Sequence, residues 1–442
     1  MKNTVSQGKR MGRRRFLGVA GLGLAAPFLL PSRARGANER IALGVLGTGS
    51  RGRQVMMEGF ATNPDIMVTA VCDVQEERRN RAARLIDEHY ERKGCVACND
   101  FRDVLRRDGI DAVLITAPDH WHGVMATMAA AAGKDLYCEK PLGVSVHEGQ
   151  AIRDAARRHD IVFQTGTQQR SGSEFRQACE LARGGYLGEV RTIEVGAPGP
   201  RYKPKYTGPL DPQPVPPGLD WELYVGPAPM APYNPGRLEW PDWYLIRDYC
   251  AGFIVNWGVH HLDIANWGCP RLATEPFELA CTGDYRSKGL TDNINGWQAT
   301  FEYPGGLRLA YSDTDNPYRQ GVCFRGSEGW VHVNRKGIEA EPASLLDITV
   351  PSDEARLQVS NHHARDFVES VKSRRDPVSP VESGHHASTL GLVAEIAARV
   401  QRKLHWDPAS ETFPGDDEAT RLLERPLRAP WSLDGAMTEK SG

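Results

Sequence analysis

From residue 40 to residue 165 the chain alternates short apolar runs with longer segments in which charged side chains recur at helical spacing. Continuous apolar runs are typical of strands buried on both faces of a parallel sheet, and the segments between them have the length of crossover helices. The predicted strands are residues 41–47, 68–72, 112–116, 135–138 and 161–164. The predicted helices are residues 54–62, 76–89, 101–107, 122–132 and 146–159. The pattern predicts a doubly wound α/β domain over residues 38–165.

After residue 166 the pattern changes to strand-like segments that follow one another closely. Residues 190–195 alternate apolar and polar side chains with the period of two of a half-buried strand, and Gly-containing turns separate several later segments. The predicted strands are residues 190–195, 277–282, 296–303, 307–311, 321–325 and 330–333, and the predicted helices are residues 173–183, 362–373 and 386–403. We predict a C-terminal α+β domain over residues 166–405 with a large open, mainly antiparallel sheet.

Two further segments lack a periodic pattern. Residues 198–241 are rich in Pro and Gly and too long for a simple connection, so we interpret them as a site-forming or partner-contacting loop. Residues 406–442 are rich in Pro and are predicted to form an extended C-terminal arm on the surface.

Composition narrows the class of protein. Hydrophobic residues make up 40% of the 442 residues and charged residues 25%, which excludes a disordered or fibrous chain. Residues 1–37 hold eight of the 54 lysines and arginines and no acid, so the remainder carries 46 basic against 56 acidic side chains. Because an acidic body lacks the basic face that neutralises phosphates, we expect no nucleic-acid partner. No segment is apolar for long enough to span a bilayer, so we expect no membrane partner either.

Residues 1–37 have the pattern of a targeting peptide. Arg13-Arg14-Arg15-Phe16-Leu17 precedes a mild apolar run over residues 18–30 and then Pro31. This order resembles the signal of the twin-arginine pathway, which carries folded proteins; an ordinary secretory signal and a basic N-terminal helix are the alternatives. We therefore predict a periplasmic or otherwise exported protein that can take a bound cofactor with it.

The nine cysteines are odd in number and mostly scattered. A chain of this size does not need disulfides to hold its core, so most are interpreted as buried small apolar side chains. Cys95 and Cys98 form the only C-x-x-C pair, without nearby histidines, and we expect a loop disulfide or an inert pair rather than a zinc site. No metal site is predicted.

A glycine-rich segment follows the first predicted strand. Gly47, Gly49 and Gly52 form G-x-G-x-x-G between a strand and a helix, and Asp73 ends the next strand. The first glycine permits a tight turn, the second lets the backbone approach a pyrophosphate, and the third lets helix and strand pack closely. The context predicts a Rossmann dinucleotide-binding domain in which Ser50 and Arg51 also lie at the cofactor, since helix N–H groups bind anions.

The acid at the end of the second strand bears on the choice of cofactor. Asp73 would accept hydrogen bonds from the adenosine ribose and repel a 2′-phosphate, which favours NAD. Arg51 and Arg53 leave NADP possible.

Two other segments carry residues suited to proton transfer. Glu139-Lys140-Pro141 lies at the carboxyl end of the predicted strand 135–138, the edge at which ligands bind to open parallel sheets. If residues 256–263 are helical, Asn256, His260 and Asp263 share one face. An imidazole with a pKa near 6.5 can take a proton from an alcohol at neutral pH, while an ammonium group can stabilise the developing alkoxide or act as the base itself.

With these motifs in the same order, the sequence resembles the Gfo/Idh/MocA family of oxidoreductases, which includes glucose–fructose oxidoreductase and inositol dehydrogenase. The resemblance rests on the glycine fingerprint, Pro118-Asp-His-Trp-His122, Glu139-Lys140-Pro141 and residues 252–263, and it covers nearly all of the chain after residue 37. It implies that Lys140 and His260 are the catalytic lysine and histidine. Asn256 stands where the family usually has an aspartate, which bears on any dyad in which a carboxylate raises the basicity of the histidine.

The remaining candidates are assigned by their neighbourhood. Residues expected to border the cofactor are Pro118, His122, Glu139 and Lys140. Residues expected to contact a sugar through polar groups are Gln168, Arg170, Tyr244, Arg247, Asn256 and Asp263, with Gln169 and Trp257 nearby.

Three functions remain open at this stage. The leading hypothesis is an exported NAD-linked oxidoreductase that acts on a secondary hydroxyl of a sugar, glycoside or cyclitol with a tightly bound nicotinamide. The second is a redox-neutral glycosidase that oxidises the sugar transiently, as some members of the family do, although those members tend to lack the lysine of Glu139-Lys140-Pro141. The third is a non-catalytic sugar-binding protein. The resemblance also implies a homo-oligomer, a dimer or a tetramer.

Overall fold

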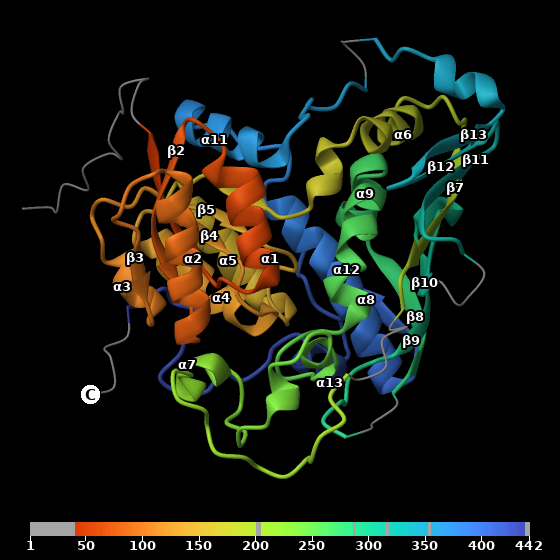
Figure 1. The fold of residues 1–442 in the computed structure, drawn as a ribbon. Helices are drawn as coiled ribbons and strands as arrows, with labels where there is room; N and C mark the ends of the chain where they lie inside the picture. The colour runs from red at the N-terminus through yellow and green to blue at the C-terminus, as the bar shows by residue number, and fades with distance from the viewer. Residues whose placement is uncertain (1–39, 200–204, 286–288, 314–317, 352–354, 438–442) are drawn as a thin grey trace, which may run out of the picture. The chain divides into compact units, whose positions relative to one another are not determined.

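The computed structural model describes residues 40–199, 205–285, 289–313, 318–351 and 355–437 (Figure 1). The predicted signal in residues 1–37 lies outside these residues. The described residues belong to one compact unit built on two sheets.

The first sheet is parallel, as the apolar runs predicted. Its six strands lie in the order β3-β2-β1-β4-β5-β6, and every pair of neighbours is parallel. The strands are β1 (Ile41–Leu46), β2 (Ile66–Cys72), β3 (Val96–Cys98), β4 (Ala112–Ile115), β5 (Asp135–Cys138) and β6 (Phe163–Thr165). Strand β3, which sequence reasoning missed, is a short edge strand that contains Cys98. The Rossmann prediction is confirmed.

Helices cover both faces of this sheet (Figure 1). They are α1 (Ser50–Gln54), α2 (Glu76–His89), α3 (Phe101–Leu105), α4 (His122–Ala131) and α5 (Val146–Arg158). The helix predicted over residues 54–62 starts earlier, because α1 begins directly at the glycine turn, and it continues as a π-helical segment over Val55–Ala61.

The second sheet has eight strands in the order β13-β12-β11-β7-β10-β9-β8-β14. The strands are β7 (Val190–Ala197), β8 (Phe277–Asp284), β9 (Gly296–Glu302), β10 (Arg308–Asp313), β11 (Gly321–Gly326), β12 (Trp330–Asn334), β13 (Gly337–Glu341) and β14 (Leu404–Trp406). All neighbours are antiparallel except β7 and β10, so the predicted mainly antiparallel sheet is confirmed.

One face of the second sheet carries the larger apolar core. Alternating buried residues such as Leu279 and Phe301 point to this face and pack against helices α6 (Ser173–Arg183), α9 (Val259–Gly268) and α12 (Val381–Val400). The remaining helices of this part are α7 (Trp221–Val225), α8 (Phe253–Asn256), α10 (Arg271–Thr274), α11 (His363–Ser373) and α13 (Asp417–Arg421). Helix α12 begins before the predicted residue 386, directly after Pro380, and ends where Gln401 takes a left-handed conformation.

The C-terminal part of the chain differs from the prediction of a simple extended arm. Residues 404–406 add strand β14 to the second sheet, and α13 follows. Trp431 is 7% exposed and packs edge-to-face on Trp121 of the first domain, with ring centres 4.8 Å apart. The arm therefore returns to the Rossmann domain, because its aromatic side chain finds a buried site there.

The cysteines and the apolar character of the helices bear on two smaller expectations. All nine cysteines are free, so the disulfide alternative for Cys95 and Cys98 is wrong. Cys95 directly precedes strand β3, and Cys98 is its last residue. In the described part of the chain, no helix combines the length and apolar character that crossing a bilayer requires.

Candidate active site

The glycine turn has the geometry that its sequence predicts. Gly47 has φ +92°, and a Cβ there would lie 2.7 Å from the backbone nitrogen of Ala117. A Cβ on Gly52 would lie 2.3 Å from the carbonyl oxygen of Gly47. Both distances are far below van der Waals contact, so only glycine lets α1 start this close to β1 and β4.

Asp73 closes the other side of this turn. Its Oδ2 accepts hydrogen bonds from the backbone nitrogen and the hydroxyl of Thr48 at 2.8 and 3.1 Å, and its Oδ1 accepts from the backbone nitrogen of Gln75. The carboxylate therefore ties the ends of β1 and β2 together at the place where an adenosine ribose is bound in this fold.

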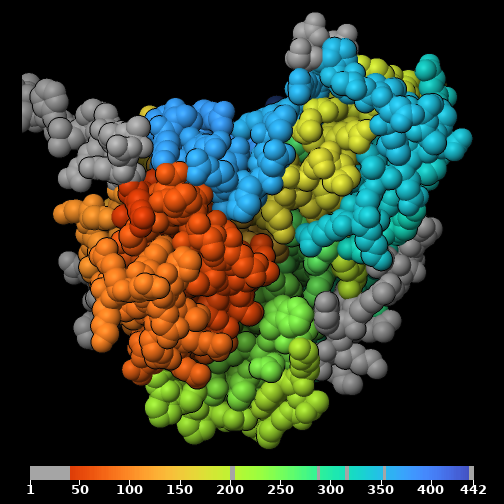
Figure 2. Space-filling view, turned by 45° about the horizontal axis from the view of Figure 1, so that its top comes forward, coloured from red at the N-terminus to blue at the C-terminus, as the bar shows by residue number. Residues whose placement is uncertain are grey.

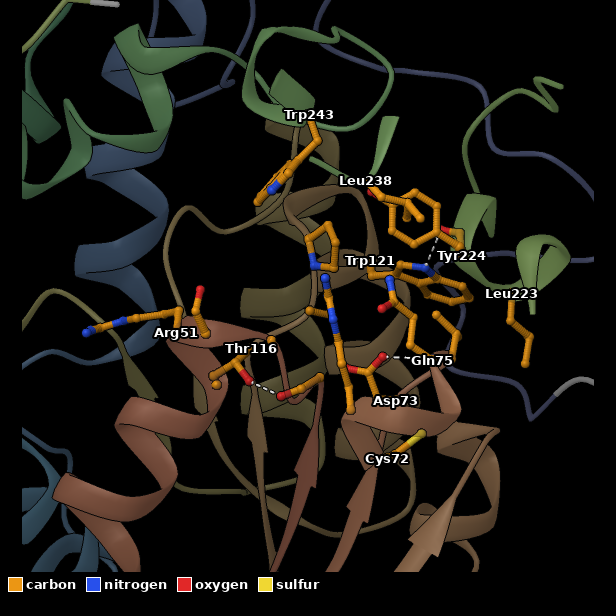
Figure 3. A pocket seen from close by; sticks show the side chains of 18 of the residues that line it. Arg51, Cys72, Asp73, Gln75, Thr116, Trp121, Leu223, Tyr224, Leu238 and Trp243 are labelled. Atoms are coloured by element: carbon orange, nitrogen blue, oxygen red, sulfur yellow. Dashed lines mark hydrogen bonds between the residues drawn. The ribbon is translucent and has the colours of Figure 1, made fainter. Parts of the chain in front are cut away.

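A cavity of about 390 Å³ opens beside the glycine turn. Its floor consists of the ends of the parallel strands, including Thr116 and Asp73, and its opposite wall comes from residues 223–244 (Figure 3). Aromatic and apolar side chains line this wall, among them Tyr224, Leu238 and Trp243, and Trp121 of the Rossmann domain also lines the cavity. Part of residues 198–241, the segment predicted to form a site or to contact a partner, thus lines this cavity.

The cavity fits a dinucleotide. Gly47 and Gly49 are partly exposed and leave backbone accessible to a pyrophosphate, and the apolar wall suits an adenine ring. Arg78, which sequence reasoning did not single out, also lines the cavity, and its Nη1 lies 3.7 Å from where a Cβ on Gly49 would stand. Of the predicted cofactor residues, Gly47, Gly49, Ser50, Arg51, Gly52, Asp73 and Pro118 line it.

Glu139 and His122, two other predicted cofactor residues, make protein contacts instead. Glu139 is 4% exposed, and its Oε1 accepts from Nε and Nη2 of Arg51 at 3.0 and 2.8 Å, which fixes the start of α1 against the loop after β5. The ring nitrogens of His122 lie 2.7 Å from the carbonyl oxygen of Pro141 and 2.9 Å from that of Ala117. This histidine therefore holds two loops at the sheet edge together.

Lys140 lies at one end of a buried chain of hydrogen-bonded polar side chains. Its Nζ donates to the carbonyl oxygen and to the side-chain Oδ1 of Asn256, both at 2.8 Å. Nδ2 of Asn256 in turn donates to both oxygens of Asp119 at 2.9 and 2.7 Å. Asp119 and Asn256 are 2% and 1% exposed. Burial lowers the pKa of Lys140, while Asp119 and Glu139 act in the opposite direction.

His260 follows one turn after Asn256 at the start of α9. It is 5% exposed, and its Nδ1 has no hydrogen-bond partner in the described part of the chain. Burial and the nearby charges of Lys140 and Arg335 lower its pKa well below the ordinary value. The imidazole is therefore neutral at neutral pH, the form that can accept a proton.

The segment before His260 is not one continuous helix. Helix α8 ends at Asn256, and α9 begins at Val259. A Cβ on Gly258 between them would lie 1.8 Å from the hydroxyl oxygen of Tyr311 on β10, so the break coincides with the close approach of this segment to the second sheet.

Two predicted substrate residues bind each other. Arg170 pairs in bidentate fashion with Asp263 at 2.8 and 2.7 Å, and both side chains are buried. We therefore leave these two out of the proposed substrate site. The backbone of Arg247 bonds to the side chains of Asp292 and Arg425, while its side-chain Nε is buried without a partner among the described residues, so its role stays a prediction.

Tyr244 and Gln168 remain candidates. Tyr244 lines the cavity. Burial raises the pKa of its hydroxyl, and the nearby charges of Asp119 and Glu139 act in the same direction. Oε1 of Gln168 is buried without a partner among the described residues. The carbonyl oxygen of Gln168 can therefore accept a hydrogen bond from a bound molecule, whereas the hydroxyl of Tyr244 is already bonded to the side chain of Trp240.

Family models match both parts of the chain. Residues 41–167 match the model described as "Oxidoreductase family, NAD-binding Rossmann fold", and residues 173–433 match "Oxidoreductase family, C-terminal alpha/beta domain". The chain belongs to the Gfo/Idh/MocA family. The first domain is thus the NAD-binding domain of this family, and the glycine turn, Asp73 and the cavity fit NAD.

Curated relatives match over part of their length. A "Glycosyl hydrolase family 109 protein" of Saccharopolyspora erythraea is 34% identical over 190 residues, which is 39% of this chain and 40% of the relative. The "Uncharacterized oxidoreductase YrbE" of Bacillus subtilis is 27% identical over 162 residues, 37% of this chain and 46% of the relative. The matches span less than half of either relative.

Solved structures share the fold over most of the chain. The aldose-aldose oxidoreductase from Caulobacter crescentus, complexed with glycerol, has a TM-score of 0.62 and 18% identity, covering 83% of this chain and 99% of that one. The apo scyllo-inositol dehydrogenase from Lactobacillus casei at 77 K has a TM-score of 0.57 and 17% identity, covering 83% and 98%. At this identity the likeness concerns the fold.

One departure from the Gfo/Idh/MocA pattern now has a structural context. Asn256 replaces the aspartate usual in the family, and its amide contacts Lys140 and Asp119 rather than the imidazole of His260. Asp119, which sequence reasoning missed as a functional residue, thus provides the buried carboxylate. Its place within Pro118-Asp-His-Trp-His122 was the available signal.

Proposed function

We propose that this protein is an NAD-dependent oxidoreductase that acts on a secondary hydroxyl of a sugar, glycoside or cyclitol. The observation that carries the proposal is the placement of Lys140, whose Nζ uses two of its three protons on Asn256 next to the NAD-binding edge of the sheet. The third proton is available to an oxygen of the substrate. Bound NAD supplies the chemistry of a hydride acceptor.

Lys140, His260 and Asp119 have different roles in the transfer of the proton and the stabilisation of charge. The free N–H of Lys140 can donate to the reacting oxygen and stabilise its negative charge as it develops. The neutral imidazole of His260 can take the hydroxyl proton. Asp119, connected through Asn256, places a negative charge behind the lysine and favours its charged form.

A substrate panel tests this function. Protein loaded with NAD is mixed with neutral aldoses, cyclitols and acidic sugars, and reduction of the nicotinamide is followed by its fluorescence. At least one sugar or cyclitol should reduce it. Purified protein that carries no nicotinamide by mass spectrometry and binds no added NAD or NADP contradicts the proposal.

Export by the twin-arginine pathway is part of the proposal. Arg13-Arg14-Arg15 and the apolar run after it support it. Free nicotinamide nucleotides are scarce outside the cytoplasm, so an exported enzyme would hold NAD tightly and restore it with a second substrate. Fractionation of cells expressing the full chain, compared with an Arg13→Lys, Arg14→Lys and Arg15→Lys variant, tests this: only the wild type should reach the periplasm.

A redox-neutral glycosidase is the second candidate. The match of 190 residues to a glycosyl hydrolase family 109 protein supports it. Such an enzyme should release nitrophenol from nitrophenyl glycosides without net formation of NADH, whereas a dehydrogenase should accumulate NADH and release no nitrophenol.

We also propose that the protein forms homo-oligomers through the open face of the second sheet. The side chains of β8 alternate between buried and exposed, so one face of the sheet lies against helices and the other is open. Light scattering after size-exclusion chromatography should give a mass of a dimer or tetramer, and a monomer contradicts this.

A further inference from the structure

Arg335 lies on the tight turn between β12 and β13 and extends toward the catalytic histidine. Its guanidinium carbon is 5.0 Å from the ring centre of Trp257, and the rings of Trp257 and His260 are 5.5 Å apart. Arg335 also contributes to lowering the pKa of His260. Its charge therefore acts on the imidazole, although the two residues come from different parts of the fold.

The surface is hollowed in this region. Figure 2 shows the cyan part of the second sheet on one side and the red start of the Rossmann domain on the other, with green residues between them. Arg335 is exposed, whereas His260 is buried. The side chain of Arg335 is thus accessible from solvent, while it extends toward the buried His260.

Among the described residues, the charge of Arg335 has no partner of opposite sign, because no carboxylate lies within 4.0 Å of it. By contrast, Arg319 just before β11 and Arg325 on β11 pair with Glu339 and Glu194. The carboxylate of the site that interacts with it electrostatically, Glu139, is already bonded to Arg51. An unpaired guanidinium beside a catalytic histidine is a binding group for an anion.

Neighbouring amides complete a polar surface around it. Nη2 of Arg335 donates to Oε1 of Gln169 at 3.3 Å. Gln169 is 3% exposed, and its Nε2 is buried without a partner in the described residues, as is Oε1 of Gln168. A buried donor and a buried acceptor without partners are costly unless a bound molecule satisfies them.

We propose that Arg335, Gln169 and Gln168 bind an anionic group of the substrate, so that the enzyme acts on acidic sugars. The proposal rests on the proposed oxidoreductase function. The guanidinium, held over the ring of Trp257, binds the anion in bidentate fashion, and the amides bind adjacent hydroxyls. A sugar carboxylate and a sugar phosphate share this chemistry.

The pyrophosphate of NAD is not the anion that Arg335, Gln168 and Gln169 would bind. The pyrophosphate of NAD belongs at the glycine turn, where Arg78 lines the cavity. Arg335, Gln168 and Gln169 do not line that cavity. The anion they bind is therefore a second one, on the side of the second sheet.

The test compares ligands that differ in charge and little in shape. Glucuronate and glucuronamide, and galacturonate and galacturonamide, are titrated calorimetrically into full-length protein loaded with NADH, which cannot oxidise them. Glucose 6-phosphate against glucose tests a phosphate as the anion. The variants are Arg335→Gln, Arg335→Lys, and Lys336→Gln, which removes a neighbouring exposed charge as the control.

We expect at least one uronate to bind about tenfold or more tightly than its amide, the gain typical of a charge-assisted hydrogen bond. Arg335→Gln should abolish the difference, Arg335→Lys should retain part of it, and Lys336→Gln should leave it unchanged. Preference for the phosphate alone supports an anion site for phosphate esters. No preference for any anion, or a preference that persists in Arg335→Gln, overturns the proposal. Oxidation of neutral sugars in the panel would leave the proposed function standing in that case.

Discussion

Lys140 Nζ donates a hydrogen bond to Oδ1 of Asn256 at 2.8 Å, and this bond fixes which way the amide points. Nδ2 must then face Asp119, to whose carboxylate it donates. An aspartate at position 256, usual in the family, would set two buried carboxylates against each other. In this chain the counter-charge of the lysine therefore comes from Asp119, one side chain further away.

The first prediction concerns this arrangement. Asn256→Asp should lower the free energy of unfolding by roughly 1–3 kcal/mol at about pH 8, because one of two facing carboxylates loses its donor and is repelled. The loss should shrink in acid, where one carboxylate takes up a proton. Urea unfolding at about pH 8 and in acid measures this loss of stability. The double variant Asp119→Asn/Asn256→Asp restores one acid and one amide and should recover most of the stability; a double variant as unstable as the single one contradicts the arrangement.

The second prediction separates chemistry from cofactor binding. Lys140→Met and His260→Gln should each lower kcat/KM on the identified substrate about a hundredfold or more, since each removes a group that handles the reacting proton or charge. The Kd for NAD should not change, because neither residue lines the cavity. Lys336→Met, at an exposed position, is the matched control. A parallel loss of NAD affinity would mean that these residues support the cofactor site instead.

The third prediction concerns the choice of cofactor. Asp73→Asn removes the charge that repels a 2′-phosphate and keeps an oxygen that can accept from Thr48. The ratio of the Kd for NADP to that for NAD should therefore fall by about tenfold or more. Calorimetric titration of both nucleotides measures it, with Glu76→Gln, an exposed acid at the start of α2, as the control. An unchanged ratio would show that Asp73 does not set the preference.

The fourth prediction is a pH dependence of stability. Burial raises the pKa of Glu148 to about 7, although its Oε2 accepts from the backbone nitrogen of Val144. Between the ordinary value of 4.5 and about 7 the folded state keeps a proton that the unfolded state releases, so the contribution of Glu148 falls as pH rises through this window. The fall amounts to about 3 kcal/mol.

Glu148→Gln tests this directly, because the amide stays neutral at every pH. The difference in unfolding free energy between wild type and variant should change across this window in favour of the variant and stay level above it. Glu174→Gln, an exposed acid in the first turn of α6, serves as the control. A difference that does not vary with pH contradicts the raised pKa.

Local features of the sequence were sufficient to predict most of the Rossmann domain. The strand over residues 112–116 and the helix over residues 76–89 were located closely, because strong apolar runs and helical periodicity are local properties. Short edge strands such as β3 and β14 were missed, because their few residues pair only once the rest of the sheet is present.

Some residues of the candidate site could also be predicted from local sequence, whereas others depend on contacts between distant segments. The glycine turn and Asp73 were found because spacing along one strand–turn–helix unit specifies them. Arg170 and Asp263 were predicted to bind substrate, yet they pair with each other across 93 positions of sequence, a contact that no local pattern reveals. Arg335 was missed because a single arginine in a turn carries no signal until the sheet places it beside Trp257.

The succession of strands and helices along the chain, the glycine turn and the family motifs were therefore determined by the sequence alone. Each of these features depends on neighbours within a few residues. The tertiary structure decided which charged groups remain available to a ligand. Hydrogen bonds and Coulomb forces act through space and not along the chain. Asn256 therefore connects Asp119 to Lys140 only where the two domains meet, and the folding of the second domain pairs Arg170 with Asp263. The same folding leaves Arg335 without a carboxylate partner among the described residues.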